Sequence, residues 1–146
     1  PGRVQRMSAG TGIRHAEFNP SPDHPVHLLQ IWLQPDAAGH TPSYEELDIG
    51  PEGARNQLLL VASAEDDDGA TTWHQDARLY AAKLDQDRQL ELELPPARHA
   101  WLQLISGEVD VNGTLLAAGD AAAVSAESRL VMQARQDSEF LLFDLA

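Results

Sequence analysis

The sequence contains no cysteine. This absence excludes disulfide bonds, thiolate nucleophiles, and the zinc and iron–sulfur sites that depend on Cys ligands. Basic residues are also scarce, since 10 Lys and Arg stand against 23 Asp and Glu and leave a formal net charge of −13. A negative field of this size repels phosphate backbones and anionic membranes, so neither nucleic acid nor a membrane surface is an expected partner.

Long hydrophobic runs are missing as well. No apolar stretch approaches the roughly 18 residues that a membrane-spanning helix requires. A cytoplasmic protein is therefore expected. The chain begins at Pro1 rather than at an initiator Met, and we interpret it as a fragment of a longer protein.

What the sequence does contain is hydrophobic alternation with a period of two, which indicates strands. Residues 89–94 alternate perfectly, with three leucines on one face and Gln or Glu on the other, as in a strand with one face on a core and one in water. Asn112-Gly113 lies between two short apolar runs and predicts a two-residue hairpin. Further strands are predicted at 26–34, 57–64, 78–84, 100–105, 129–134 and 139–145. So many short strands favour an antiparallel barrel or sandwich, with the jelly roll among the options.

One segment is typical of a helix. Ser43 is a suitable N-cap and Glu46 occupies the capping-box position three residues later, so 43–47 predicts one short helical turn. It lies in a stretch rich in Pro and Gly, residues 34–56, where we place the main internal boundary.

The most informative stretch is residues 7–17, Met-Ser-Ala-Gly-Thr-Gly-Ile-Arg-His-Ala-Glu. If its end is extended, His15 and Glu17 leave the same face of a strand, because side chains at i and i+2 do so. An imidazole beside a carboxylate suits a divalent transition metal. A metal centre needs three or four protein ligands, however, and no second His-rich cluster lies nearby. We therefore expect the remaining ligands upstream of this chain.

Other histidines and motifs have simpler explanations. His24 and His27 are three residues apart beside a proline, which favours a loop or strand start over a metal pair. His40 is expected to be solvated, and His74 to be a hydrogen-bonded structural residue. Gly10-Thr11-Gly12 lacks the third glycine and the following helix of a dinucleotide-binding motif.

Two further patterns are assigned structural roles. Residues 65–69 (Glu-Asp-Asp-Asp-Gly) resemble a calcium loop but have no Glu at the twelfth position, so a solvated hairpin tip is predicted. Trp32, Trp73 and Trp101 lie in strand-like runs and are assigned to the core.

Residues 5–21 resemble the end of the N-terminal cupin domain of the pirin family, in its bacterial, quercetin-dioxygenase-like branch. The resemblance continues through 27–32, 41–45, 74–76 and 138–145, and so covers nearly the whole chain. Pirins are bicupins, with two β-barrels in one chain. The resemblance implies an all-β, jelly-roll type cupin fold. It implies three regions: the last strands of the N-terminal barrel (1–34), a linker with a short helix (35–56), and a C-terminal cupin barrel without metal ligands (57–146).

The family's N-terminal barrel holds one metal through three His and one Glu. On the resemblance, His15 and Glu17 match the third and fourth ligands, and Glu17 is also the candidate catalytic base. The first two ligands, a His-x-His pair, belong upstream. The implied cofactor is a divalent transition metal, with iron first and copper, nickel, manganese or zinc as alternatives.

The C-terminal region departs from a catalytic cupin. Where such a barrel places a His-x-His pair followed by a Glu, residues 95–101 supply only His99, and no Glu at metal spacing follows before Gly107. After Gly119-Asp120, where a later His is usual, the sequence continues with alanines. This region is therefore interpreted as a structural or partner-binding lobe.

Two functions follow from the resemblance. The first is a metal-dependent dioxygenase acting on quercetin or a related flavonol, to which this chain contributes part of the site. The second is a non-catalytic metal- or redox-sensing protein that acts through protein contacts. Leu29, Ile31 and Leu33 would form an uncovered apolar face. Its expected partner is the missing N-terminal segment carrying His-x-His, or a second copy in a homodimer.

Overall fold

The computed structural model describes residues 2–66 and 69–146, and within them all regular structure is β-strand. The strands are β1 (Arg3–Ser8), β2 (Ser43–Asp48), β3 (Leu59–Ser63), β4 (Thr71–Thr72), β5 (Ala77–Leu84), β6 (Gln89–Glu93), β7 (His99–Ser106), β8 (Glu108–Val111), β9 (Thr114–Ala117), β10 (Ala121–Val124), β11 (Arg129–Ala134) and β12 (Ser138–Leu145). The predicted all-β class is confirmed. No helix in the described residues is long and apolar enough to cross a membrane.

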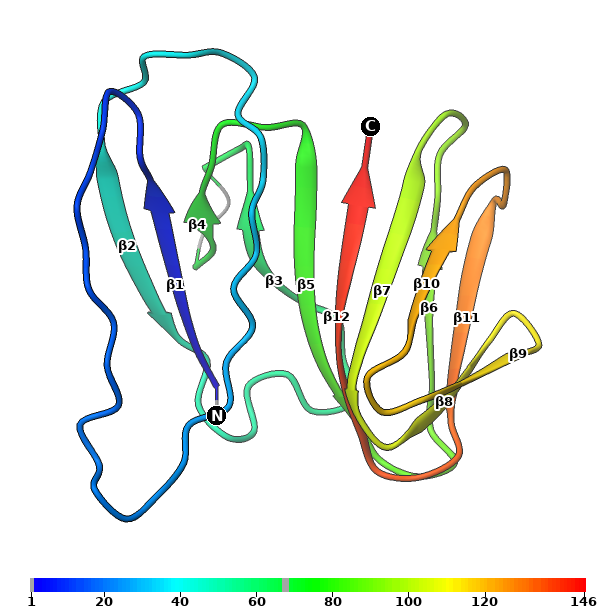
Figure 1. Ribbon diagram of the computed structural model, residues 1–146. Helices are drawn as coiled ribbons and strands as arrows, with labels where there is room; N and C mark the ends of the chain where they lie inside the picture. The colour runs from blue at the N-terminus through cyan, green and yellow to red at the C-terminus, as the bar shows by residue number, and fades with distance from the viewer. Residues whose placement is uncertain (1, 67–68) are drawn as a thin grey trace.

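Two sheets face one another in the C-terminal region. One has the strand order β10-β7-β12-β5-β3-β4 and the other the order β6-β11-β8-β9. Figure 1 shows them as two layers, with β12 and β5 in the middle of the first. In the described residues, neighbouring strands of both sheets pair antiparallel, except β3 and β4, which pair parallel. This arrangement agrees with the predicted jelly-roll barrel.

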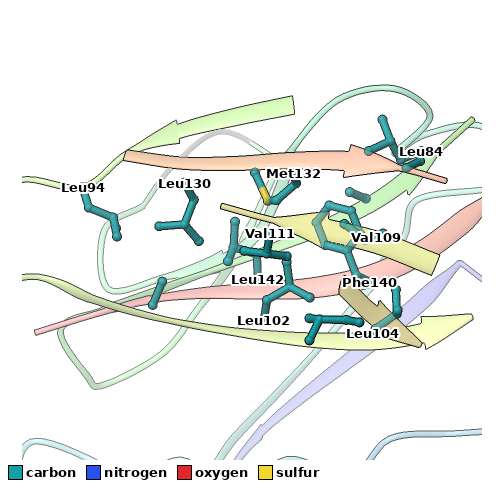
Figure 2. Packing of buried hydrophobic residues seen from close by; sticks show 14 residues of the cluster. Leu84, Leu94, Leu102, Leu104, Val109, Val111, Leu130, Met132, Phe140 and Leu142 are labelled. Carbon is teal, nitrogen blue, oxygen red and sulfur yellow. The ribbon is translucent and has the colours of Figure 1, made fainter. Parts of the chain in front are cut away.

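The space between these sheets is filled by apolar side chains (Figure 2). Phe140 and Leu142 of β12 are fully buried there, as are Leu130 and Met132 of β11 from the opposite sheet. Each strand contributes alternate residues, because successive side chains of a strand point to opposite faces. The interior of the barrel is therefore a packed core.

The other face of the six-stranded sheet has a second, smaller core. Val61 and Ala62 of β3, Leu79 of β5 and Phe143 of β12 are buried in it. Val4, Leu47 and Ile49, which lie in or next to β1 and β2, pack against this cluster. The small β1–β2 sheet therefore covers part of the outer face of the barrel.

The strongest local predictions are confirmed. In β6 the leucines face inward, Leu94 just beyond it is 3% exposed, and the intervening Glu91 and Glu93 are exposed. Asn112 and Gly113 have φ of 49° and 85° and connect β8 to β9. Positive φ at both positions is the requirement of the tight hairpin turn that these two residues predict.

The predicted helix at 43–47 is wrong. These residues form β2, which pairs antiparallel with β1 from Arg3–Asp48 to Ser8–Ser43. Arg6 donates a 2.5 Å hydrogen bond to the hydroxyl of Ser43 and forms an ion pair with Glu45. A single helical turn has a costly nucleus and few bonds, so pairing with a distant strand outweighs the local capping pattern.

The predicted strand at 26–34 is also not observed. Residues 29–33 lie against the outer face of β7 and β12, where they line a groove with Trp101 and Phe143, but residues 26–34 pair with no strand in the described part of the protein. The side chains of this stretch are largely exposed: Trp32 is 89% exposed, against the core position predicted for it. Trp101 is 42% exposed on the outer face of β7, and only Trp73 is half-buried.

Three short strands, β1, β4 and β10, were not predicted from the sequence. The acidic stretch 65–69, predicted as a solvated hairpin tip, includes Asp67 and Asp68, which lie outside the described residues; Glu65 and Asp66 beside them are exposed.

Candidate functional site

The two candidate metal ligands lie in a long connection between β1 and β2. Residues 9–42 leave the small sheet and return to it, forming the large loop at the left of Figure 1. The two ends of this loop meet closely, because a Cβ on Gly10 would overlap the carbonyl of His40. His15 and Glu17 are both exposed and lie outside regular strands. Their predicted strand geometry is therefore not present in this chain.

The described residues contain no group of three His, Asp or Glu side chains able to hold a metal ion. His15 and Glu17 thus have no third ligand in that part of the protein. As a donor set, one imidazole and one carboxylate fit half of a three-His, one-Glu site.

One further polar residue lies close to Glu17. Tyr44 of β2 has a raised pKa, chiefly because its hydroxyl donates a hydrogen bond to Glu46, and the charge of Glu17 contributes to the same shift. Tyr44 was not predicted to lie near Glu17, because residues 43–47 were predicted to form a helical turn. The observed position of Tyr44 follows from the pairing of β1 with β2.

His24 and His27 take no part in a site. The backbone N–H of His24 donates a 3.0 Å hydrogen bond to Ser21, and its carbonyl accepts a 2.6 Å hydrogen bond from Asn19. His27 is exposed and follows this turn. The predicted loop location of both residues is confirmed.

His40 and His74 form a contact that the sequence did not predict. Their rings stack with centroids 3.8 Å apart, and Nε2 of His40 lies 2.7 Å from Oδ1 of Asp36. The expectation of a solvated His40 is wrong, because the ring is half-buried against His74. The His40 hydrogen bond is the main reason that the pKa of Asp36 is lowered.

These contacts join the loop to the C-terminal lobe. The backbone N–H of Asp36 donates to the carbonyl of His74 at 2.7 Å, and the side chain of Gln75 donates to the carbonyl of Gln34 at 2.7 Å. The end of the loop is therefore fixed on the segment between β4 and β5. His74 has the structural role predicted for it, through its backbone and its ring.

The interior of the C-terminal barrel offers no alternative metal site among the described residues. Leu102, Leu104 and Leu130 occupy the central positions and are at most 1% exposed. His99 is exposed on the outside, where its Nδ1 lies 2.8 Å from the hydroxyl of Ser125.

Two parts of the chain match different family models. Residues 60–145 match the family model described as the quercetinase C-terminal cupin domain, and residues 1–33 match the pirin model. The chain belongs to the pirin family. Its six- and four-stranded sheets therefore form the C-terminal cupin of that family, as the resemblance implied.

Pirin relatives match the chain along its length. A relative from Pasteurella multocida is 44% identical over 147 residues, covering 99% of this chain and 61% of that protein. The quercetin 2,3-dioxygenase of Escherichia coli is 41% identical over 144 residues, with the same two coverages. The crystal structure of the bacterial pirin YhhW from Escherichia coli in complex with nickel(II) superimposes with a TM-score of 0.91 at 41% identity, and the chain covers 99% of itself and 61% of that structure. The chain thus spans about three fifths of the length of these relatives.

Proposed function

We propose that the intact protein is a metal-dependent dioxygenase acting on quercetin or a related flavonol, and that this chain contributes His15 and Glu17 to its metal site. The observation that carries the proposal is the His-x-Glu pair in residues that match the pirin model, in a chain 41% identical to a quercetin 2,3-dioxygenase. A relative solved with nickel(II) supports a divalent metal as the cofactor.

The local structure suits a site that is completed from outside this chain. His15 and Glu17 are exposed, and both belong to a loop with no strand partner in the described residues. The same loop exposes Phe18, Val26 and Leu28 at 80%, 59% and 56%. Exposed apolar side chains on the loop that carries the candidate ligands suit burial against a further segment of the intact protein. We infer that a segment carrying His-x-His covers this loop.

The roles of the two residues follow from their chemistry. A ring nitrogen of His15 would offer its lone pair to a bound metal, and His15 would have no proton-transfer role. Glu17 offers two carboxylate oxygens, so it can coordinate through one and accept the proton of a substrate hydroxyl at the other. A bound divalent metal would supply Lewis acidity toward substrate oxygen.

The test is a turnover assay on the intact protein loaded separately with iron, nickel, copper, manganese or zinc. We expect quercetin loss and oxygen consumption in equal amounts with at least one metal. Glu17→Gln should lower kcat by about 10²–10⁴-fold, the usual contribution of a general base. If the intact protein binds metal but consumes neither flavonol nor oxygen, the enzyme proposal is wrong. The alternative, a non-catalytic metal- or redox-sensing protein that acts through protein contacts, is then favoured.

A further inference from the structure

The C-terminal barrel has charged residues at one end of its interior. Along β12 the inward-facing series Phe140 and Leu142 continues, two residues on, with Asp144. Along β5 the inward-facing series Leu84 and Ala82 continues with Tyr80 and then Arg78. The barrel interior thus changes from apolar to polar toward the end where the chain finishes (C in Figure 1).

A cavity of about 210 Å³ lies at this end. Its apolar wall includes Tyr80 of β5, Leu92 of β6 and Pro95, and its charged lining includes Arg98 and Asp144. A water molecule takes up roughly 30 Å³ of liquid volume, so the cavity has room for a small organic molecule rather than a single water. The cavity is separate from the loop that carries His15 and Glu17.

The partly buried guanidinium of Arg98 is already neutralised. Nε of Arg98 donates to Oδ1 of Asp144 at 2.6 Å, Nη1 donates to Asp76 at 2.8 Å, and Nη2 donates to the carbonyl of Asp144 at 3.2 Å. Nη2 of Arg78 lies 3.7 Å from a carboxylate oxygen of Glu65. Neither arginine is therefore a strong attractor for an anion.

Asp144 differs from them. Its side chain is only 6% exposed, yet Oδ1 alone of its two carboxylate oxygens accepts a side-chain hydrogen bond in the described part of the protein. A buried carboxylate is expected to have its lone pairs satisfied. Its second oxygen therefore offers an acceptor to a donor group that enters the cavity.

The charge of the lining selects among donors. Among the residues that the structure describes, the acidic lining residues are Glu65, Asp76, Glu93 and Asp144, and the basic ones are Arg78 and Arg98. The excess is negative, as it is for the chain as a whole. An ammonium group is favoured over a hydroxyl by this field, and a carboxylate is disfavoured.

From this geometry we propose that the mouth of the C-terminal barrel is a binding site for a small primary amine. Its ammonium group donates to Asp144, and its compact apolar body lies against Tyr80, Leu92 and Pro95. The site is independent of the metal chemistry proposed above. The amine-binding proposal is therefore tested separately from the dioxygenase function.

Benzylamine is a suitable probe, with benzyl alcohol and benzoate as neutral and anionic counterparts of similar shape. Titration into the isotopically labelled chain, followed by NMR, should give a Kd for benzylamine in the millimolar range. The shifted amides should cluster at Ala77, Leu92 and Asp144. Benzyl alcohol should bind more weakly by about tenfold or more, and benzoate should leave these amides unchanged.

Two variants locate the site. Asp144→Asn should weaken benzylamine binding by about tenfold or more, because it removes the charge of the acceptor. Ala64→Phe, at an exposed position on the rim, should block the cavity while leaving the Arg98–Asp144 pair in place. Ala118→Phe, at an exposed alanine outside the cavity lining, is the matched control and should bind like the parent.

The proposal is overturned if benzylamine shifts none of the lining residues, if benzoate shifts them equally, or if Ala64→Phe binds benzylamine as the parent does. Because Ala64→Phe does not alter the buried ion pair, it remains informative even where Asp144→Asn does not fold.

Discussion

The imidazole rings of His40 and His74 stack in parallel, with centroids 3.8 Å apart and an angle of 4° between their planes. The first ring belongs to the loop that carries the candidate metal ligands, and the second to the C-terminal lobe. Asp36 holds the pair in place, through a side-chain hydrogen bond with His40 and a backbone hydrogen bond to His74. This cluster therefore attaches the loop with the two candidate ligands to the C-terminal barrel.

The titration of Asp36 reports on this attachment. Its pKa is lowered, chiefly by the hydrogen bond from His40. A lowered folded-state pKa contributes stability above the ordinary Asp value of about 3.9, and that contribution is lost as the pH falls through the lowered pKa. In His40→Ala the pKa of Asp36 should return toward its ordinary value, as followed by NMR of the carboxyl carbon. An Asp36 that titrates identically in parent and variant would contradict the contact.

The Arg98–Asp144 ion pair should matter more for stability than an exposed pair. Their side chains are 20% and 6% exposed, whereas those of Arg129 and Glu91 are 58% and 44% exposed. Arg98→Ala removes the ion-pair partner of the buried Asp144 carboxylate. It should therefore lower the free energy of unfolding by about 3 kcal/mol. Arg129→Ala, the matched control, should cost less than about 1 kcal/mol. Urea unfolding measures both, and equal losses would mean that the Arg98 pair is not effectively buried.

The interior of the barrel should behave as a packed core rather than as a ligand cavity. Phe140 is 0% exposed between the two sheets, so Phe140→Ala should cost about 3–5 kcal/mol of unfolding free energy. Leu115 is 57% exposed on β9, and Leu115→Ala should change that energy by less than about 0.5 kcal/mol. A small effect of Phe140→Ala in thermal or urea unfolding would show that the interior is loosely filled.

Two glycines with similar backbone angles should respond differently to substitution. Gly107 and Gly113 have φ of +84° and +85°, but a Cβ at Gly107 would overlap Ser138 and the carbonyl of Asp137, whereas nothing surrounds a Cβ at Gly113. Gly113→Ala should cost only the backbone strain, about 1–2 kcal/mol. Gly107→Ala adds overlap with buried atoms and should cost about 3 kcal/mol or more. Chemical unfolding of both variants tests the difference, and equal costs would contradict the crowding at Gly107.

How far the sequence predicts this structure depends on where each segment finds its partner. The alternation of residues 89–94 and the Asn112-Gly113 turn specify their own structure locally, and both are confirmed. Residues 43–47 have a helical capping pattern, but Arg6 and the other residues of β1, far away in sequence, pair with them and decide the outcome. Residues 26–34 have the composition of a strand, but they form no ladder with any strand in the described chain.

For the candidate site too, local motifs could be predicted from the sequence, whereas contacts between distant segments could not. The His-x-Glu pair was found from its spacing and from the resemblance of residues 5–21 to pirins, and the pirin model does match this region. The roles of His15 and Glu17 remain predictions, because no third ligand lies with them in the described residues. His40, Tyr44 and Asp144 gave no signal in the sequence, since their contacts depend on segments brought together only by the fold.

The most direct test of the account is the metal content of the intact protein, measured by mass spectrometry of the metal after purification and loading. We predict one divalent metal per chain in the parent, with metal lost in His15→Ala and in Glu17→Ala. His99→Ala, which removes an exposed histidine of the C-terminal barrel, should retain it. Full metal occupancy in His15→Ala, or loss of metal in His99→Ala alone, would contradict the assignment of the metal site to the N-terminal lobe.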